Sequence, residues 1–217
     1  MAVITISRQF GAGGKTLGKK VAEALNYTFA DDDIVQRIAE LAKVSAGWVE
    51  SVEKEAGGRL SRIVNKMVSK PLVDRILKDE RGYIDEQIYI DYLVLLISQL
   101  AEEGKVVILG RGSQYILNDM PDAYHFLLIN TDDNRVRFIS EAYNVSESKA
   151  NAIVKHEDRR RINLYRKIGK QDYDQPELYH LVINMAKVSM DEAIRLIIDM
   201  VAQGSAKEKE AAAGGSI

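Results

Sequence analysis

The stretch that decides the fold is AVITISRQFGAGGKTLGKKVAEAL, residues 2–25. The apolar run VITI (3–6) precedes a glycine-rich segment at 11–14, and apolar residues then recur at helical spacing from Leu17 to Leu25. This order predicts a short buried strand, a tight loop and an amphipathic helix. Backbone amides of such a loop and the positive end of the following helix suit a phosphate group.

The loop nearly matches the phosphate-binding pattern GxxxxGK[ST]. Aligned on its lysine, the pattern takes Gly14, Lys15 and Thr16, and Gln9 stands where the first glycine belongs. In a second register, GAG (11–13) supplies the inner glycines of the loop, and the lysine is then displaced by one position. Both registers predict phosphate binding, and the alternative to both is a glycine-rich turn without a ligand.

Composition limits the classes of function. The 217 residues are 46% hydrophobic, enough for one sizeable domain, and Lys+Arg 30 nearly balance Asp+Glu 32. The charge balance argues against a global grip on nucleic acid or on an anionic membrane, so any anion site is local. Without cysteine there are no disulfides, thiolate zinc sites or cysteine nucleophiles. With no basic leader before the first strand, we expect a cytoplasmic protein.

Short apolar runs bounded by turn signals alternate with helical spacing along much of the chain, which predicts an α/β protein with parallel strands. The predicted strands are 3–6, 27–30, 106–109, 125–129 and 180–184. In such sheets the binding site lies at the carboxyl ends of the strands.

One region breaks the alternation. Residues 33–103 show only helical pattern, which predicts an all-helical insertion that covers the substrate. We therefore expect a single domain over 1–203, with a core made of 1–32 and 104–203. The Ala/Gly/Lys/Glu-rich end, 204–217, predicts a disordered tail.

Two further segments add a resemblance. KVVILGRGSQYILNDMPDAYHFLLINTDDNRVRFI (105–139) has a Gly-Arg pair after a strand, and HEDRRRINLYRKIGKQDYDQPELYHLVINMAKVSMDEAIRLI (156–197) has an arginine-rich helix, a strand and a closing helix. With the first loop, they resemble the cytidylate kinase-like family of P-loop proteins, in particular a subgroup whose loop begins SRQFG. Gln9 is then a feature of that subgroup.

The resemblance implies a three-layer P-loop fold, with a five-stranded parallel sheet in the order 2-3-1-4-5, a helical monophosphate-binding insertion and a helical lid over about 155–175. It implies phosphoryl transfer from ATP, with Mg²⁺, to a nucleoside monophosphate, most simply CMP or dCMP. The alternatives are a kinase of another small metabolite and an ATP-binding regulatory protein without efficient turnover. Small-molecule nucleotides would be the partners of a monomer or homodimer.

The family's motifs also assign residues. The ATP phosphates would meet Arg8, Gly11, Ala12, Gly13, Gly14, Lys15 and Thr16. The Thr16 hydroxyl would ligate Mg²⁺, and Lys15, Arg161 and Arg166 would stabilise charge on the transferred group. The alternative for the arginines is a solvated basic helix face.

On the substrate side, the resemblance assigns Asp31, Arg111 and Asp158 to the acceptor, with Asp158 also orienting the lid arginines, and places Arg135 beside the adenine. Surface turns and ordinary helix charges are the alternatives for these residues. In FADDDI (29–34), Asp33 is the expected helix cap.

The chain departs from the family around its Gly-Arg pair. The family's DGRD is LGRGS here, with Leu109 and Gly112 in place of the two carboxylates. This departure weakens the expectation of CMP more than that of phosphoryl transfer, and it makes Asp31 or Asp32 a candidate for the metal shell.

Overall fold

A computed structural model of the chain describes residues 2–31, 86–170 and 172–214. The chain divides into two compact units, Met1–Ala30 with Gly104–Ile217, and Asp31–Glu103. Most of the predicted helical insertion lies outside the described residues. Its described end is helix α6 (Glu86–Glu103).

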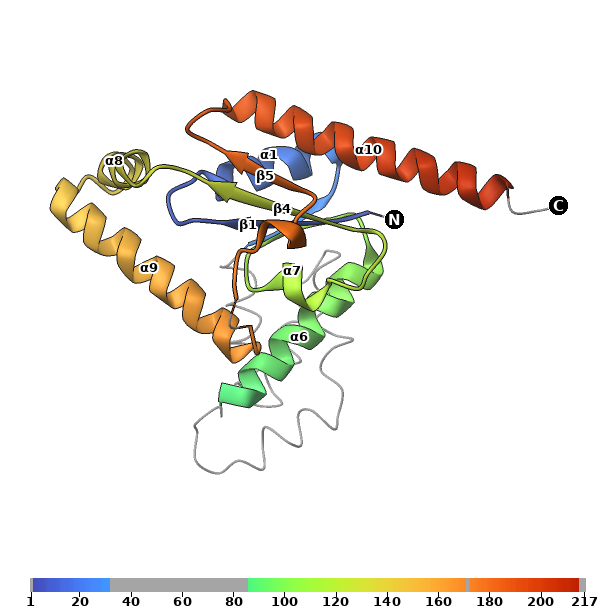
Figure 1. Cartoon of the computed structure of the whole chain (residues 1–217), viewed down its shortest axis with the longest axis horizontal. Coiled ribbons are helices and arrows are strands. Elements are labelled where there is room, and N and C mark those ends of the chain that lie inside the picture. The colour runs from blue at the N-terminus through green and yellow to red at the C-terminus, as the bar shows by residue number, and fades with distance from the viewer. Residues whose placement is uncertain (1, 32–85, 171, 215–217) are drawn as a thin grey trace, which may run out of the picture. The chain divides into compact units, whose positions relative to one another are not determined.

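The first unit is built on a five-stranded parallel sheet (Figure 1). Its strands are β1 (Val3–Arg8), β2 (Thr28–Ala30), β3 (Val106–Leu109), β4 (Ala123–Ile129) and β5 (Leu181–Asn184). The order is β2-β3-β1-β4-β5, which confirms the predicted α/β class and sheet order. In register, Ile6 of β1 lies beside Leu109 of β3 and Phe126 of β4, so the chain leaves all three strands at one edge.

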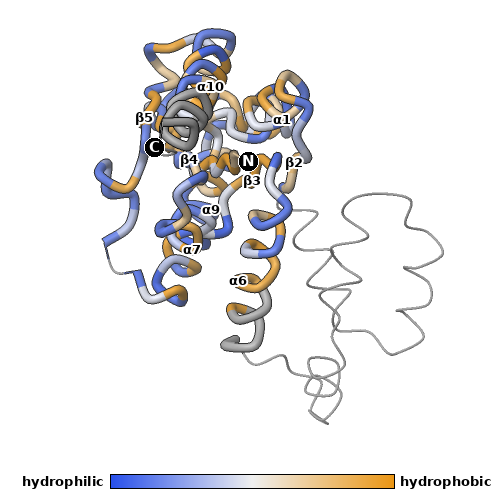
Figure 2. Tube along the Cα trace, turned by 90° about the vertical axis from the view of Figure 1, so that its right-hand side faces the viewer, coloured by the Kyte–Doolittle hydropathy of each residue, from blue (hydrophilic) through white to orange (hydrophobic). Residues whose placement is uncertain are grey.

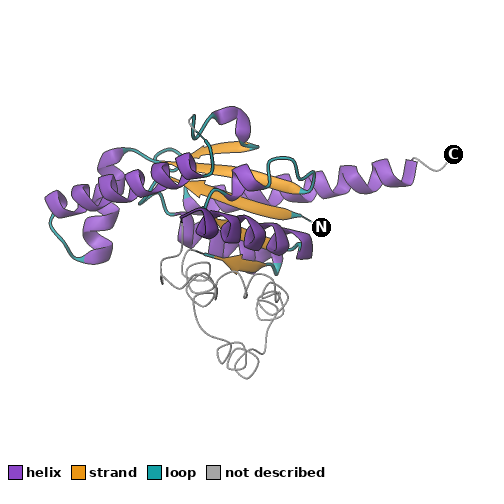
Figure 3. Cartoon of the chain, turned by 90° about the horizontal axis from the view of Figure 1, so that it is seen from below, coloured by secondary structure: helices purple, strands orange, loops and turns teal. Residues whose placement is uncertain are grey.

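One face of the sheet carries the main apolar core. Helices α1 (Gly14–Leu25) and α10 (Met190–Gly214) cover this face and lie above the strands in Figure 1, whereas Figure 3 views the sheet from the opposite side. Ile4 and Ile6 of β1 meet Leu17 of α1 and Ile197 of α10 there, all fully buried. Hydrophobic residues accordingly gather along the strands in Figure 2. Burial of this face fixes the start of α1 against the end of β1.

The opposite face of the central strands is more polar. Thr5, Ser7 and His125 are buried there, and Thr5 Oγ1 lies 2.7 Å from His125 Nδ1. The backbone N–H of His125 donates to His180 Nδ1 at 3.0 Å. Burial, with the neighbouring His180, lowers the pKa of His125 to about 4. The neutral imidazole is therefore part of the folded core near pH 7.

Helices α8 (Asp132–Tyr143) and α9 (Glu147–Lys167) pack against each other beyond the carboxyl ends of the strands, and their axes cross, so that α8 is seen end-on beside the length of α9 in Figure 1. Thr131 and Ser146 cap their first turns by accepting backbone N–H bonds. Phe10 packs against a small apolar cluster between the two helices, made of Ile139, Ala150 and Val154. The Phe10 side chain thus anchors the phosphate loop to α8 and α9.

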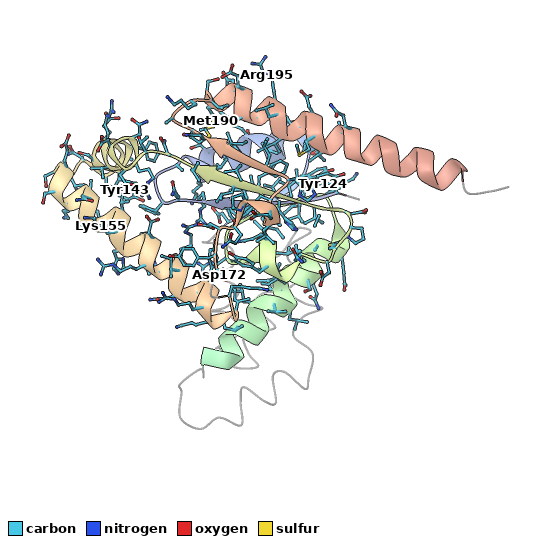
Figure 4. All side chains as sticks on the ribbon, viewed as in Figure 1. Tyr124, Tyr143, Lys155, Asp172, Met190 and Arg195 are labelled. Carbon is cyan, nitrogen blue, oxygen red and sulfur yellow. The ribbon has the colours of Figure 1, made fainter. Side chains whose placement is uncertain are left out.

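Helix α10 extends to Gly214, where the sequence predicts a disordered tail from residue 204. Ala, Lys and Glu are strong helix formers, and this propensity outweighs the lack of apolar anchors. Near residue 204 the helix crosses β4 closely, because a β-carbon on Gly204 would overlap the hydroxyl of Tyr124. Figure 4 labels Tyr124 on β4 and Met190 at the start of α10.

Among the described helices, none has the length and apolarity needed to cross a bilayer.

Candidate active site

The phosphate loop joins the end of β1 to the start of α1. Gly11 and Gly13 adopt left-handed backbone angles, with φ 83° and 87°, and Gly13 is the N-cap of α1. No side chain caps this helix end, and the first backbone N–H groups of a helix lack partners within the helix, so they can donate to an anion. Lys15 and Thr16 are exposed on the first turn. This is the arrangement that an anionic phosphate group requires.

Gly11 is needed for a second reason. A β-carbon at this position would lie 3.0 Å from the carbonyl oxygen of Arg135, at the start of α8. The loop can therefore approach α8 this closely only without a side chain at residue 11.

Gln9 has a structural role at the place of the missing first glycine. Its backbone N–H donates to the Leu128 oxygen at 3.0 Å, and its Oε1 accepts from the Asn130 N–H at 2.9 Å. Gln9 therefore ties the beginning of the loop to the end of β4. The residues that would contact a phosphate are therefore the later ones in the loop, Gly11 to Thr16.

The Gly-Arg turn after β3 is unusual in its backbone. Gly110, Arg111 and Gly112 all have positive φ, at 71°, 58° and 71°. For a side-chain-bearing residue, this conformation costs about 1–2 kcal/mol. A β-carbon on Gly110 would collide with the guanidinium of Arg8, so that group lies directly against the turn. The two arginines are thus held at the carboxyl ends of neighbouring strands.

The arginine-rich segment forms part of one continuous helix, α9, and its residues face different sides. Asp158, Arg161 and Tyr165 follow each other at spacings of three and four, which places them on one inner face. Arg161 is 13% exposed. Arg160 points outward and pairs with Glu157 at 3.1 Å. Of the predicted catalytic arginines, Arg161 is therefore mostly covered on the inner face of α9, whereas Arg166 is exposed.

Arg161 is held by groups that sequence reasoning missed. Its Nη1 lies 2.6 Å from Asp174 Oδ2, and its guanidinium stands over the Tyr165 ring, 5.6 Å from the centroid. Burial works against the charged form, but Tyr165 and Asp174 outweigh it, so the pKa of Arg161 is raised. Tyr179 donates its hydroxyl to Asp174 Oδ1 at 3.1 Å. In the sequence, Asp174 is marked only as an acidic residue within the segment that resembles the lid.

The carboxyl end of α9 rests on the Gly-Arg turn and on helix α7 (Ser113–Ile116). A β-carbon on Gly112 would collide with Ile168. The rings of Tyr115 and Tyr165 meet edge to face, with centroids 5.0 Å apart. Since α9 and the turn are in contact, the helix that carries Arg161 is fixed relative to Arg111.

Arg135 and Asp158 were assigned to different substrates, but the structure brings them together. Arg135 Nη1 donates to Asp158 Oδ2 at 2.7 Å, and Nη2 donates to Asp132 Oδ1 at 2.6 Å. Burial works against the charge, but the two carboxylates outweigh it and raise the pKa of Arg135. The adenine-side role of Arg135 and the orienting role of Asp158 stay predictions. Because the two side chains bind each other, a change in either one would affect both roles.

Asp31 follows directly after β2 and is 8% exposed, and it belongs to the second unit. Asp32 and Asp33, the other members of the predicted triad, lie outside the described residues. Within residues 2–31, 86–170 and 172–214, no three His, Asp or Glu side chains gather into a metal-binding group.

A sequence profile of the Cytidylate kinase-like family matches residues 3–187, from β1 into the loop after β5. The chain belongs to this family. The match includes the phosphate loop, the Gly-Arg turn and α9.

Curated relatives match over a shorter stretch. Shikimate kinase of Baumannia cicadellinicola is 39% identical over 62 residues, and shikimate kinase 1 of Erwinia tasmaniensis is also 39% identical over 62 residues. Each match takes 28% of this chain and 35% of the relative. The chain thus spans about a third of the length of these relatives.

Solved structures resemble the cytidylate kinase-like chain over nearly its whole length. An uncharacterized protein from Eubacterium ventriosum has a TM-score of 0.61 at 21% identity, covering 93% of this chain and 99% of that one. Shikimate kinase from Bacteroides thetaiotaomicron has a TM-score of 0.50 at 15% identity, covering 93% and 98%. At these identities the likeness shows a shared fold.

Proposed function

We propose that this protein transfers the terminal phosphoryl group of ATP to a small-molecule acceptor. The uncapped start of α1, preceded by left-handed Gly11 and Gly13, carries the proposal because it presents N–H groups to a phosphate. Lys15 would neutralise charge on the transferred group, and Thr16 would hold Mg²⁺, which supplies further charge stabilisation when bound.

The arginines suit the same chemistry. Phosphoryl transfer needs positive charge on the equatorial oxygens and an in-line geometry more than covalent participation. Arg161 is preoriented by Asp174, and Arg8 and Arg111 stand at the ends of adjacent strands. We assign Arg161 to the transferred group, Arg8 to the ATP phosphates and Arg111 to the acceptor.

For the acceptor, our first candidate is a nucleoside monophosphate such as CMP or dCMP, and family membership supports it. Leu109 and Gly112 weigh against cytidine specificity because neither can accept a hydrogen bond from a sugar or base through its side chain. A hydroxylated metabolite without a base is the second candidate. The 39% identity to shikimate kinases over 62 residues favours it.

A coupled assay of ADP formation tests the proposal. ATP and Mg²⁺ are supplied with a panel of nucleoside monophosphates and hydroxylated acids, and we expect acceptor-dependent ADP release. Lys15→Ala should lower kcat by about 100-fold or more, as removal of such an electrostatic group does. Lys19→Ala is the matched control, because Lys19 lies one turn further on the exposed face of α1 beside Glu23.

The results separate the candidates. ADP release with CMP but not with shikimate would support a nucleotide acceptor. ADP release with shikimate but not with CMP would support a hydroxylated metabolite without a base. Binding of ATP without stimulation by any acceptor would instead indicate a regulatory protein. Equal loss in the Lys15 and Lys19 variants would contradict the assignment of Lys15.

A further inference from the structure

The backbone N–H and C=O of Phe10, in the first half of the phosphate loop, are each bonded to one member of the same ion pair. Asp158 Oδ1 accepts the Phe10 N–H at 3.2 Å, and Arg135 Nη1 donates to the Phe10 carbonyl oxygen at 3.2 Å. The same Nη1 donates to Asp158 Oδ2 at 2.7 Å, which closes a ring of contacts. Three segments far apart in the sequence meet in this ring, namely the loop, α8 and α9.

The ring is partly buried and its charges are compensated. The side chain of Arg135 is 6% exposed and that of Asp158 is 24% exposed. Both terminal nitrogens of Arg135 are engaged, Nη2 by Asp132 at 2.6 Å. Since the Arg135 side chain is almost fully covered by protein, little of the guanidinium face is open for a base to stack on.

The packing around the ring is equally close. Gly11 lies against the backbone of Arg135, where a β-carbon would come within 3.0 Å of the carbonyl oxygen. The Phe10 ring fills the small apolar cluster between α8 and α9. Any shift of Arg135 or Asp158 would therefore move residues 10 and 11 of the loop.

We propose that Arg135 and Asp158 are positioning residues that hold the phosphate loop in its binding conformation. In this role, Arg135 does not contact the adenine, and Asp158 does not contact the acceptor. The effect on phosphate binding rests on the proposed function. The ring itself does not, because its contacts belong to the protein alone.

The ring also links two parts of the active site. Asp158 and Arg161 lie three residues apart on the inner face of α9, so the ion pair that fixes the loop also fixes the helix carrying Arg161. Electrostatic stabilisation is strongest when the donors are in place before the reaction. One partly buried ion pair would thus set the distance between the loop amides and the arginine.

Binding of two ligands distinguishes this role from contact with the base. ATP and inorganic tripolyphosphate share the phosphate chain, and only ATP carries adenine. We expect Arg135→Met and Asp158→Asn each to weaken both ligands by the same factor, roughly 10- to 100-fold. The double variant should bind no more weakly than either single variant, and Arg135→Lys should recover part of the loss. Arg137→Met is the control, because Arg137 is exposed on α8.

Hydrogen exchange of the unliganded protein gives a second readout. Amides of residues 9–13 should exchange faster in Arg135→Met and Asp158→Asn, while those of β3 stay protected. The proposal is overturned if Arg135→Met weakens ATP but leaves tripolyphosphate unchanged, or if loop exchange does not respond. Should the unmodified protein bind neither ligand, the proposed function fails, and the exchange result alone decides whether the ring holds the loop.

Discussion

Replacing Gly110 with alanine should separate backbone strain from the placement of Arg8. Gly110 has φ 71°, and a β-carbon there would collide with the Arg8 guanidinium. Gly169 has φ 84° and nothing within 4 Å of the corresponding β-carbon. Gly169→Ala is therefore the matched control, with the same kind of strain and no displaced side chain.

Both substitutions should destabilise the protein to a similar extent. A left-handed alanine costs about 1–2 kcal/mol, which in a protein of this size lowers Tm by about 2–8 °C. Only Gly110→Ala should also lower kcat/KM. If Arg8 loses one charge-assisted bond to a phosphate, worth about 1.5–3 kcal/mol, the loss is roughly 10- to 150-fold.

Thermal unfolding and steady-state ADP release, measured on both alanine variants, check these magnitudes. Arg8→Ala should reproduce the activity of Gly110→Ala, and the double variant should lose little more. Equal activity losses in the Gly110 and Gly169 variants would refute the reasoning, since strain alone would then explain both. Full activity of Gly110→Ala would refute the assigned role of Arg8.

Three further predictions follow from buried polar contacts. Asp174→Asn removes the charge 2.6 Å from Arg161, so kcat should fall by about tenfold or more in the ADP-release assay. Because the pKa of His125 is about 4, against 6.5 for the ordinary imidazole, the unfolded chain takes up a proton first on acidification. The free energy of unfolding should therefore fall by about 2–3 kcal/mol between pH 6.5 and pH 4, as urea titrations would measure, and His125→Gln should remove this component. Gln9→Gly restores the motif's first glycine but removes the acceptor for the Asn130 N–H, bonded at 2.9 Å. It should cost about 1–3 kcal/mol in urea unfolding without tightening ATP binding.

Each of these predictions has a contrary result. Unchanged kcat in Asp174→Asn would mean that the ion pair does not orient Arg161 during the reaction. An acid-induced loss of stability that persists in His125→Gln would have to come from other groups. Tighter ATP binding by Gln9→Gly would mean that the glutamine side chain hinders nucleotide binding rather than stabilising the loop.

The sheet was predictable because its signals are local. Each strand is a short apolar run bounded by turn residues, and the strand order came from the resemblance that the loop and the Gly-Arg pair support. The domain boundary at residue 204 stays a prediction, and the helix that crosses it has a related explanation. Composition alone suggested disorder, but helix propensity in the Ala- and Lys-rich end continues α10 to Gly214.

The site was less predictable because its contacts join distant segments. Arg135 matched a family position that is associated with the base, yet its partner Asp158 lies 23 residues away on another helix. Asp174 had no motif of its own, and its pairing with Arg161 depends on the path of the chain after α9. Gln9 counted against the loop in sequence, although its side chain ties the loop to Asn130.

The place of β1 in the sheet has a consequence for synthesis of the chain. This first strand lies between β3 and β4, so Val3 is paired with Val106 and Ala123. About half of this chain must therefore leave the ribosome before β1 gains its first neighbour, β3. Contacts between residues so far apart in the sequence slow folding. An apolar strand that stays unpaired during this time is prone to aggregation. We expect the nascent chain to depend on chaperone binding near VITI until the end of β4 emerges.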